Sequence, residues 1–283
     1  MKKLLTVAAV LIALVGVLLL SLPTILHKAG LHPEHTGPTV ALPGKRALII
    51  TTSHGVLAAP GETDGPATGV MASELTHPYY VFLDGGMDVD VASIRGGEIP
   101  IDPQSLSFVV KSPEDERYLN DPVAQAKVKN SIPIADVDID QYDIVFISGG
   151  WGAAYDLAQS PVLAAKVSES YYGGKEAVIG GVCHGVLGLV NARDRDGQLL
   201  IAGRRMTGVT DKQIKELGIE MTPLHPETEL RKAGVVFESQ TAFRDMLATH
   251  VVVDEEQRFV TGQNQNSGLE TSHSMMRILS ERD

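Results

Sequence analysis

One segment of the chain constrains the fold more than any other. Residues 177–190 read Ala-Val-Ile-Gly-Gly-Val-Cys-His-Gly-Val-Leu-Gly-Leu-Val. The apolar run Ala177–Val182 predicts a buried strand, and a buried helix is expected over His184–Asn191. The sharp turn between them holds Cys183, the only cysteine in the sequence. A strand-to-helix elbow of this kind pushes one side chain out of a strained turn, at the N-terminus of the helix that follows.

The position of Cys183 favours a chemical role for its thiol. A helix N-terminus stabilises a thiolate, which is the reactive form of cysteine. A single cysteine is otherwise often a buried structural residue, but His184 and Gly185 crowd this turn and favour the chemical interpretation. We therefore predict that Cys183 is a nucleophile whose pKa lies below the ~8.5 of a free thiol.

The rest of the chain alternates between strand and helix patterns. Strands are expected at Ala47–Thr52, Val89–Ser93, Tyr142–Ser148, Val235–Phe237, His250–Val253 and Arg258–Thr261, and helices at Met71–Leu83, Pro161–Tyr172 and Ser267–Ser280. This alternation predicts a flavodoxin-like, three-layer α/β/α sandwich with a mostly parallel sheet. Ligands of such sheets lie beyond the carboxyl ends of the strands. We expect Ser53-His54, Gly149-Gly150 and Cys183-His184 to converge there on one pocket.

The N-terminus predicts a membrane anchor. Lys2-Lys3 precede Leu4–Leu26, an apolar run without charged residues. This run is long enough to cross a hydrocarbon core of ~30 Å, and no small-x-small cleavage site follows it. The two lysines favour a cytoplasmic N-terminus, which places the rest of the chain on the periplasmic or extracellular side. A cleaved signal peptide is the alternative, with the same final compartment.

Two further regions follow the expected anchor, which covers residues 1–26. Residues 27–44 are rich in Pro, Gly and His without periodicity and predict a tether, and residues 45–283 predict the folded domain. The chain has a formal net charge of −11, and its first 44 residues contribute a small positive charge. The domain is therefore strongly acidic, which argues against nucleic acid as a partner and leaves the N-terminal helix as the only expected membrane contact.

The elbow Gly180-Gly-Val-Cys-His-Gly185 resembles that of the ThiJ/PfpI superfamily, which is related to class I glutamine amidotransferases. Within Thr68–Tyr79, the "TG…E…HP" pattern is similar to the glyoxalase III and heat-shock chaperone branch of that family. Further matching segments are Asp88–Ser93, Pro100–Pro103, Thr207–Asp211 and Val260–Asn264. The resemblance extends from about Lys45 to the end of the chain, and it also implies a homodimer.

The resemblance implies a role for each residue of a candidate catalytic site. Cys183 would be the nucleophile, His184 its neighbour that sets its protonation, and Glu74 a buried carboxylic acid that faces the thiol. Gly149-Gly150 would donate backbone N–H groups to a developing oxyanion. A carboxyl group on an otherwise apolar helix is expected to be partly protonated, which independently supports the role of Glu74.

Two positions depart from the family pattern. Trp151 stands where this branch usually has a histidine after the paired glycines, and it would make the pocket mouth more apolar. Ile214 stands where relatives carry the carboxylate that completes a Cys–His–acid triad. Either the nearby Asp211 replaces this carboxylate, or His184 lacks an acidic partner and is a weaker base.

Other candidate features have ordinary explanations. His225-Pro-Glu227 matches the acid–base pair of glutamine amidotransferases, but the same letters occur at His32-Pro-Glu34. Histidine and cysteine spacings typical of metal sites are absent from the sequence, and we expect neither a metal nor an organic cofactor. Tyr79-Tyr80 are interpreted as packing residues, and the acidic stretches 114–116 and 136–140 as solvated.

Three classes of function remain open. The first is a glyoxalase III-like, cofactor-independent lyase, in which the Cys183 thiolate attacks an α-oxoaldehyde such as methylglyoxal and a hydroxy acid is formed. The second is an amidase- or peptidase-like hydrolase that uses Cys183 and His184 on an acyl substrate. The third is a non-enzymatic holdase or an oxidation sensor. Glu74 together with the paired glycines favours an enzyme.

Overall fold

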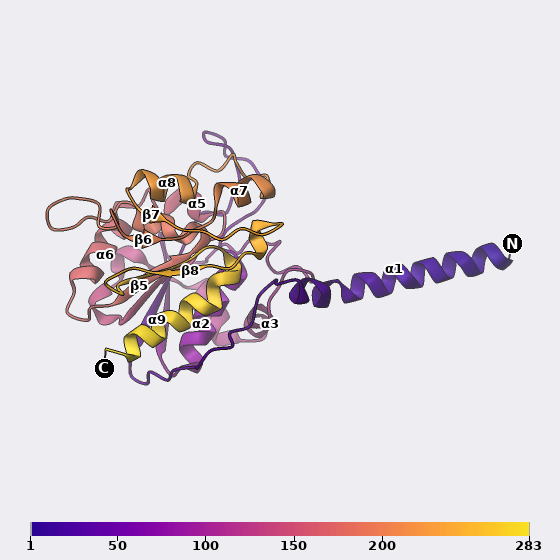
Figure 1. The fold of residues 1–283 in the computed structure, drawn as a ribbon, viewed down its shortest axis with the longest axis horizontal. Helices are drawn as coiled ribbons and strands as arrows, with labels where there is room; N and C mark the ends of the chain where they lie inside the picture. Colours follow the sequence, from indigo (N-terminus) through magenta and orange to yellow (C-terminus); the bar gives the residue numbers. More distant parts are fainter. Residues whose placement is uncertain (1, 283) are drawn as a thin grey trace.

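The computed structural model describes residues 2–282, and its centre is a seven-stranded sheet (Figure 1). The strands lie in the order β3-β2-β1-β4-β5-β9-β8, and only β8 is antiparallel to its neighbour. Their bounds are β1 Arg46–Thr51, β2 Asp88–Ser93, β3 Ile132–Pro133, β4 Ile144–Ile147, β5 Val178–Val182, β8 Val251–Val253 and β9 Phe259–Gly262. A second, two-stranded parallel sheet joins β6 Arg205–Met206 to β7 Val236–Phe237.

Helices cover both faces of the main sheet. One face carries α2 Ala72–Asp84, α3 Pro113–Leu119, α4 Pro122–Lys129 and α9 Gly268–Ser280, and the other carries α5 Ala153–Asp156, α6 Pro161–Tyr172 and α8 Pro226–Lys232. Strand β1 explains why: Ala47 and Ile49 belong to one hydrophobic cluster, and Leu48 and Ile50 to the other. A strand that is buried on both faces requires a continuous apolar run. The predicted three-layer α/β/α architecture is confirmed.

The expected strands and helices occur within a residue or two of their predicted ends, and one of them differs in type. The helix expected at His184–Asn191 is the 3₁₀ helix η3, Cys183–Leu189. It packs tightly against the end of β4, where a Cβ on Gly185 would collide with the carbonyl group of Ile147. The predicted helix is therefore present within two residues of its expected ends, but it is a 3₁₀ helix of seven residues, and the dipole available to Cys183 is that of this short helix.

The apolar N-terminal run forms the helix α1, Lys2–Lys28, which projects away from the domain (Figure 1). Leu5–Lys28 is the one span within residues 2–282 that is long and apolar enough to cross a membrane, a test that a signal sequence also passes. Its large apolar side chains are mostly exposed, including Leu11, Ile12 and Leu20.

The segment after α1 is not the free tether that its composition predicts. Leu31 and His32 are 2% and 5% exposed, and Leu42 is buried further along. The side-chain amide of Asn266 donates a hydrogen bond to the carbonyl oxygen of Gly30, and its oxygen accepts one from the backbone N–H of His32. These hydrogen bonds clamp residues 30–32 onto the domain beside the start of α9. The segment is held by isolated polar contacts, which a search for apolar periodicity does not detect.

Candidate active site

Cys183 lies at the turn between β5 and η3, with a φ of +57°. Residues other than glycine rarely adopt this left-handed conformation, and such strain concentrates at functional sites. The turn presents the sulfur beyond the carboxyl end of β5, as the elbow predicts. The side chain is nevertheless only 6% exposed, so any ligand must enter a cavity to reach it.

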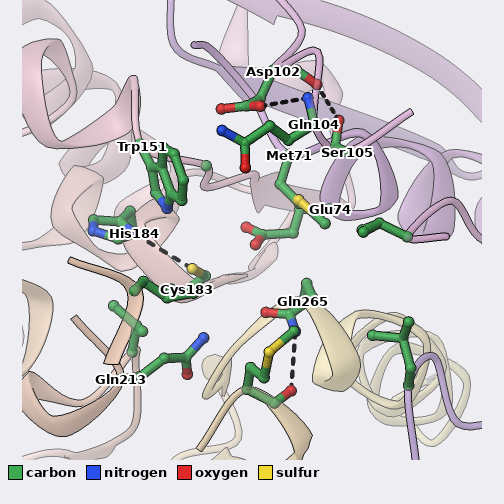
Figure 2. Close-up of a pocket in the computed structure, with 16 residues that line it drawn as sticks. Met71, Glu74, Asp102, Gln104, Ser105, Trp151, Cys183, His184, Gln213 and Gln265 are labelled. Carbon is green, nitrogen blue, oxygen red and sulfur yellow. Dashed lines mark hydrogen bonds between the residues drawn. The ribbon is translucent and has the colours of Figure 1, made fainter. Parts of the chain in front are cut away.

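Glu74 reaches the same cavity from the first turn of α2 and interacts with the Cys183 side chain (Figure 2). The residue is 1% exposed, and its carboxylate accepts a 2.9 Å hydrogen bond from the backbone N–H of Gly149. Burial raises the pKa of Glu74 to about 8. The carboxyl group is therefore largely protonated at neutral pH.

The backbone of the paired glycines after β4 faces both reactive groups. The N–H of Gly149 is engaged by Glu74, the N–H of Gly150 is directed at both Glu74 and Cys183, and the N–H of His184 is directed at Cys183. Gly150 has a φ of +87°, and a Cβ there would collide with the backbone of Gly69 and Met71. Glycine is thus required for this close approach, and two converging N–H groups are the arrangement that an oxyanion needs.

The thiol of Cys183 is less acidic than the sequence predicts. Burial raises the pKa of Cys183 well above its usual value, and a negative charge on Glu74 raises it further. Burial outweighs the contribution of the short 3₁₀ helix, so the expectation of an acidic thiol at rest is contradicted. Because the two groups interact, removal of one proton is best described as a property of the Glu74–Cys183 pair.

His184 is fully buried and has a neutral imidazole ring. Its Nδ1 lies 3.4 Å from the sulfur of Cys183. Burial lowers the pKa of His184 to about 3, and the neighbouring His225 lowers it as well. The Nε2 atom has no hydrogen-bond partner among the described residues.

Neither the family's acid position, which is Ile214 here, nor the nearby Asp211 supplies an acidic partner for His184. Ile214 is buried in the hydrophobic core, and the Asp211 carboxylate is at the surface, where it accepts a hydrogen bond from the Thr228 hydroxyl. Of the two alternatives, the structure favours a His184 without an acidic partner.

The cavity in front of Cys183 has a volume of about 150 Å³ and a predominantly apolar wall. Its polar positions are Glu74, Asp102, Gln104, Ser105, Cys183, His184, Gln213 and Gln265, and its other positions are Leu31, Met71, Val110, Gly150, Trp151, Val209, Leu217 and Met246. Figure 2 shows Trp151 beside His184 on one side of the cavity and Gln265 on the opposite side. Cys183, His184, Glu74, Gly150 and Trp151 are thus brought together.

Several outcomes differ from the sequence analysis. Ser53 and His54 do not line this cavity: the Ser53 hydroxyl bonds to that of Ser93, and the His54 ring stacks on Tyr155. Two of the three expected strand ends therefore converge. His225, which was given an ordinary explanation, lies close enough to His184 to affect its pKa, although it does not line the cavity.

Gln213 is one of the polar residues that sequence reasoning missed, together with Gln104, Ser105 and Gln265. It is 2% exposed on α7, Asp211–Leu217, and lines the cavity near Cys183. Its carbonyl oxygen lies 3.4 Å from the side-chain nitrogen of Asn264. The sequence could have indicated Gln213. Thr210 is a typical N-cap residue that marks the start of this helix, and Gln213 and its neighbour Ile214 are the buried positions of the helix.

An elbow cysteine, a buried carboxyl group and two converging N–H groups on a parallel sheet define a cysteine-centred α/β protein. The sequence profile of the DJ-1/PfpI family matches residues 66–277, and the chain belongs to this family. The predicted ThiJ/PfpI resemblance and its glyoxalase III and heat-shock branch are thereby confirmed by the relatives described next.

Curated relatives include Glyoxalase 3 of Candida albicans, 28% identical over 76% of this chain and 91% of that protein. The glutathione-independent glyoxalase HSP31 of Saccharomyces cerevisiae is 31% identical over 62% of this chain and 73% of its own length. Among solved structures, the Rapid Encystment Protein 24 kDa of Francisella tularensis is 33% identical, with a TM-score of 0.74 over 83% of this chain and 99% of that one. Glyoxalase III of C. albicans is 27% identical, with a TM-score of 0.73 over 83% and 97%.

Proposed function

We propose that this protein converts α-oxoaldehydes to 2-hydroxy acids, with Cys183 as the nucleophile and Glu74 as the proton carrier. The observation that carries the proposal is the buried carboxyl group of Glu74 beside the sulfur, with a pKa of about 8. A group with a pKa near the working pH both accepts and donates protons efficiently. The glyoxalase names of the relatives point to the same class of reaction.

The reaction starts from the pair with one proton removed. As the sulfur of Cys183 bonds to the aldehyde carbon, the thiol proton passes to Glu74, and the new alkoxide is stabilised by the N–H groups of Gly150 and His184. Glu74 then returns this proton to the alkoxide oxygen, which gives a hemithioacetal. The adduct stays covalently attached in a cavity where proton transfers are local.

The next steps move hydrogen from one substrate carbon to the other. The Glu74 carboxylate removes the proton from the former aldehyde carbon, which gives an enediolate, and returns it to the adjacent carbon. The remaining hydroxyl proton moves from one substrate oxygen to the other within the adduct. Water then cleaves the resulting thioester, which releases the hydroxy acid and restores Cys183. The net change is the addition of one water, without an external oxidant or reductant.

The test is turnover of methylglyoxal by the full-length protein, measured as loss of the dicarbonyl and formation of the hydroxy acid. Cys183→Ser is expected to abolish turnover, and Glu74→Gln to reduce kcat/KM by ~100-fold or more, because the amide cannot relay a proton. The exposed Glu62→Gln variant is the matched control and should retain activity. Near wild-type turnover by Glu74→Gln would remove its acid–base role.

The same assays separate this proposal from the two alternatives. A hydrolase would cleave chromogenic amides or peptides, and it would need His184 as a base, which its neutral and unpartnered ring disfavours. A holdase or oxidation sensor would show no turnover, whereas mild peroxide would add oxygen to Cys183, detectable as a change in mass.

We also place the domain on the extracytoplasmic side of a membrane, anchored by α1. The support is an exposed apolar helix of sufficient length, preceded by Lys2-Lys3. Full-length protein should pellet with membranes and resist carbonate extraction, and added protease should reach the domain only from the outside. A soluble mature protein that begins beyond Leu26 would replace the anchor with a cleaved signal peptide.

A further inference from the structure

The outer wall of the active-site cavity is apolar and comes from parts of the chain that are distant in sequence. We define this outer wall as Leu31, Val110, Leu217 and Met246. Val110 and Met246 are partly exposed and Leu217 is 37% exposed, whereas Cys183 and Glu74 at the inner end are buried. The cavity thus leads from a polar, reactive inner end to a mostly apolar opening, where Gln104 is the exposed polar residue.

The opening lies beside the base of α1. Leu31 follows α1 after only two residues and is held in place by the clamp around Asn266. The other amide contact of Asn266 reaches the carbonyl oxygen of Met246, so one side chain fixes two members of the outer wall. The wall is therefore a built feature of the folded domain.

Two exposed aromatic residues lie close in sequence to members of the outer wall. Of the six phenylalanines in the sequence, Phe108 and Phe243 are 60% and 93% exposed. Phe108 precedes Val110 by two residues, and Phe243 precedes Met246 by three. The other four phenylalanines are buried or partly buried. Both exposed rings thus belong to loops that supply the outer wall.

We infer that the preferred substrates are α-oxoaldehydes with an apolar chain of several carbons, whose chain lies against the outer wall while the dicarbonyl group meets Cys183. This inference rests on the proposed function and specifies its substrate class. A closed apolar cavity of about 150 Å³ in another protein takes up a six-carbon ring. The cavity here has a similar volume of about 150 Å³ and is open toward the surface. Methylglyoxal, which has one methyl group, would leave the outer wall in contact with water.

Chain length provides the test. For the full-length protein in mild detergent, kcat/KM is compared for methylglyoxal and 2-oxohexanal, which has three more methylene groups. Each methylene that leaves water for an apolar wall contributes roughly a fourfold factor. The ratio of kcat/KM for 2-oxohexanal to that for methylglyoxal should therefore be at least about 10.

A matched pair of variants locates the effect. Leu217→Ala should lower this ratio about fivefold, because it removes part of the outer wall. Leu119→Ala at the end of α3 is the control: Leu119 is 41% exposed, similar to Leu217, and lies outside this cavity. It should leave the ratio unchanged. Because both side chains are partly exposed, both variants should fold.

The outcomes separate the inference from the function on which it rests. Equal or faster turnover of methylglyoxal would overturn the substrate class and leave the proposed function intact. No turnover of either compound by folded wild-type protein would overturn both. A high ratio that Leu217→Ala does not lower would refute the role of the outer wall.

Discussion

The buried carboxyl group of Glu74 should make the stability of the protein depend on pH. Its pKa rises from 4.5 in water to about 8 in the folded protein. Between these two values the folded state holds a proton that the unfolded state has lost. The free energy of unfolding contributed by Glu74 is therefore complete below about pH 4.5 and falls as the pH rises to about 8.

The size of the effect follows from the same shift. Each pKa unit corresponds to about 1.4 kcal/mol, so the full shift amounts to roughly 5 kcal/mol for this almost completely buried group. Glu74→Gln keeps the shape of the side chain and removes its titration. Relative to this variant, wild-type protein should lose roughly 5 kcal/mol of stability between pH 4.5 and pH 8.

Urea denaturation of both full-length proteins in mild detergent, at half-unit pH intervals, measures this difference directly. Titrating groups that do not interact with Glu74 contribute equally to both proteins and cancel in the comparison, and in the wild-type protein Cys183 titrates above this pH window. A difference that stays constant over the window would show that Glu74 titrates normally in the folded state. The reasoning about its neutral form, and with it the proton relay, would then be refuted.

The remaining predictions concern the pair, the glycine turn and the clamp. The midpoint of Cys183 alkylation against pH should fall in Glu74→Gln, because a carboxylate charge no longer opposes the thiolate; an unchanged midpoint would separate the two groups. Gly150→Ala should lower the free energy of unfolding, measured in urea, by more than ~2 kcal/mol. The control is Gly197→Ala, because Gly197 has a similar φ but open space around it, and this variant should lose only ~1 kcal/mol. Asn266→Ala should lower the free energy of unfolding by about 2–3 kcal/mol and open residues 29–44 to limited proteolysis, and equal protease resistance would argue against the clamp.

The layered fold and the inner half of the site follow from local sequence patterns. Buried parallel strands need continuous apolar runs, and their ends converge by topology, so the elbow at Cys183 and the glycines after β4 could be placed in advance. Glu74 was placed by the family resemblance, and its position on an otherwise apolar helix supported the assignment. Each of these inferences needs only a short stretch of chain.

The outer half of the site could not be predicted, because it depends on contacts between distant segments. Leu31 reaches the cavity through Asn266, which lies more than two hundred residues further along the chain. The pKa of Cys183 depends on total burial, which outweighed the local effect of the turn. Ser53-His54 follow a central strand, yet a hydrogen bond from Ser53 to Ser93 and stacking of His54 on Tyr155 direct them elsewhere.

If α1 lies in a bilayer, as we propose, the clamp around residues 30–32 has a mechanical consequence for the domain. A flexible linker would let the domain tumble independently of α1, but here only Ala29 and Gly30 separate the helix from a buried residue. Transmembrane helices tilt by about 20° on average, and the tilt changes with bilayer thickness. A change in the tilt of α1 would therefore move the domain together with the helix. The thickness of the surrounding membrane would then set the height of the cavity opening above the lipid.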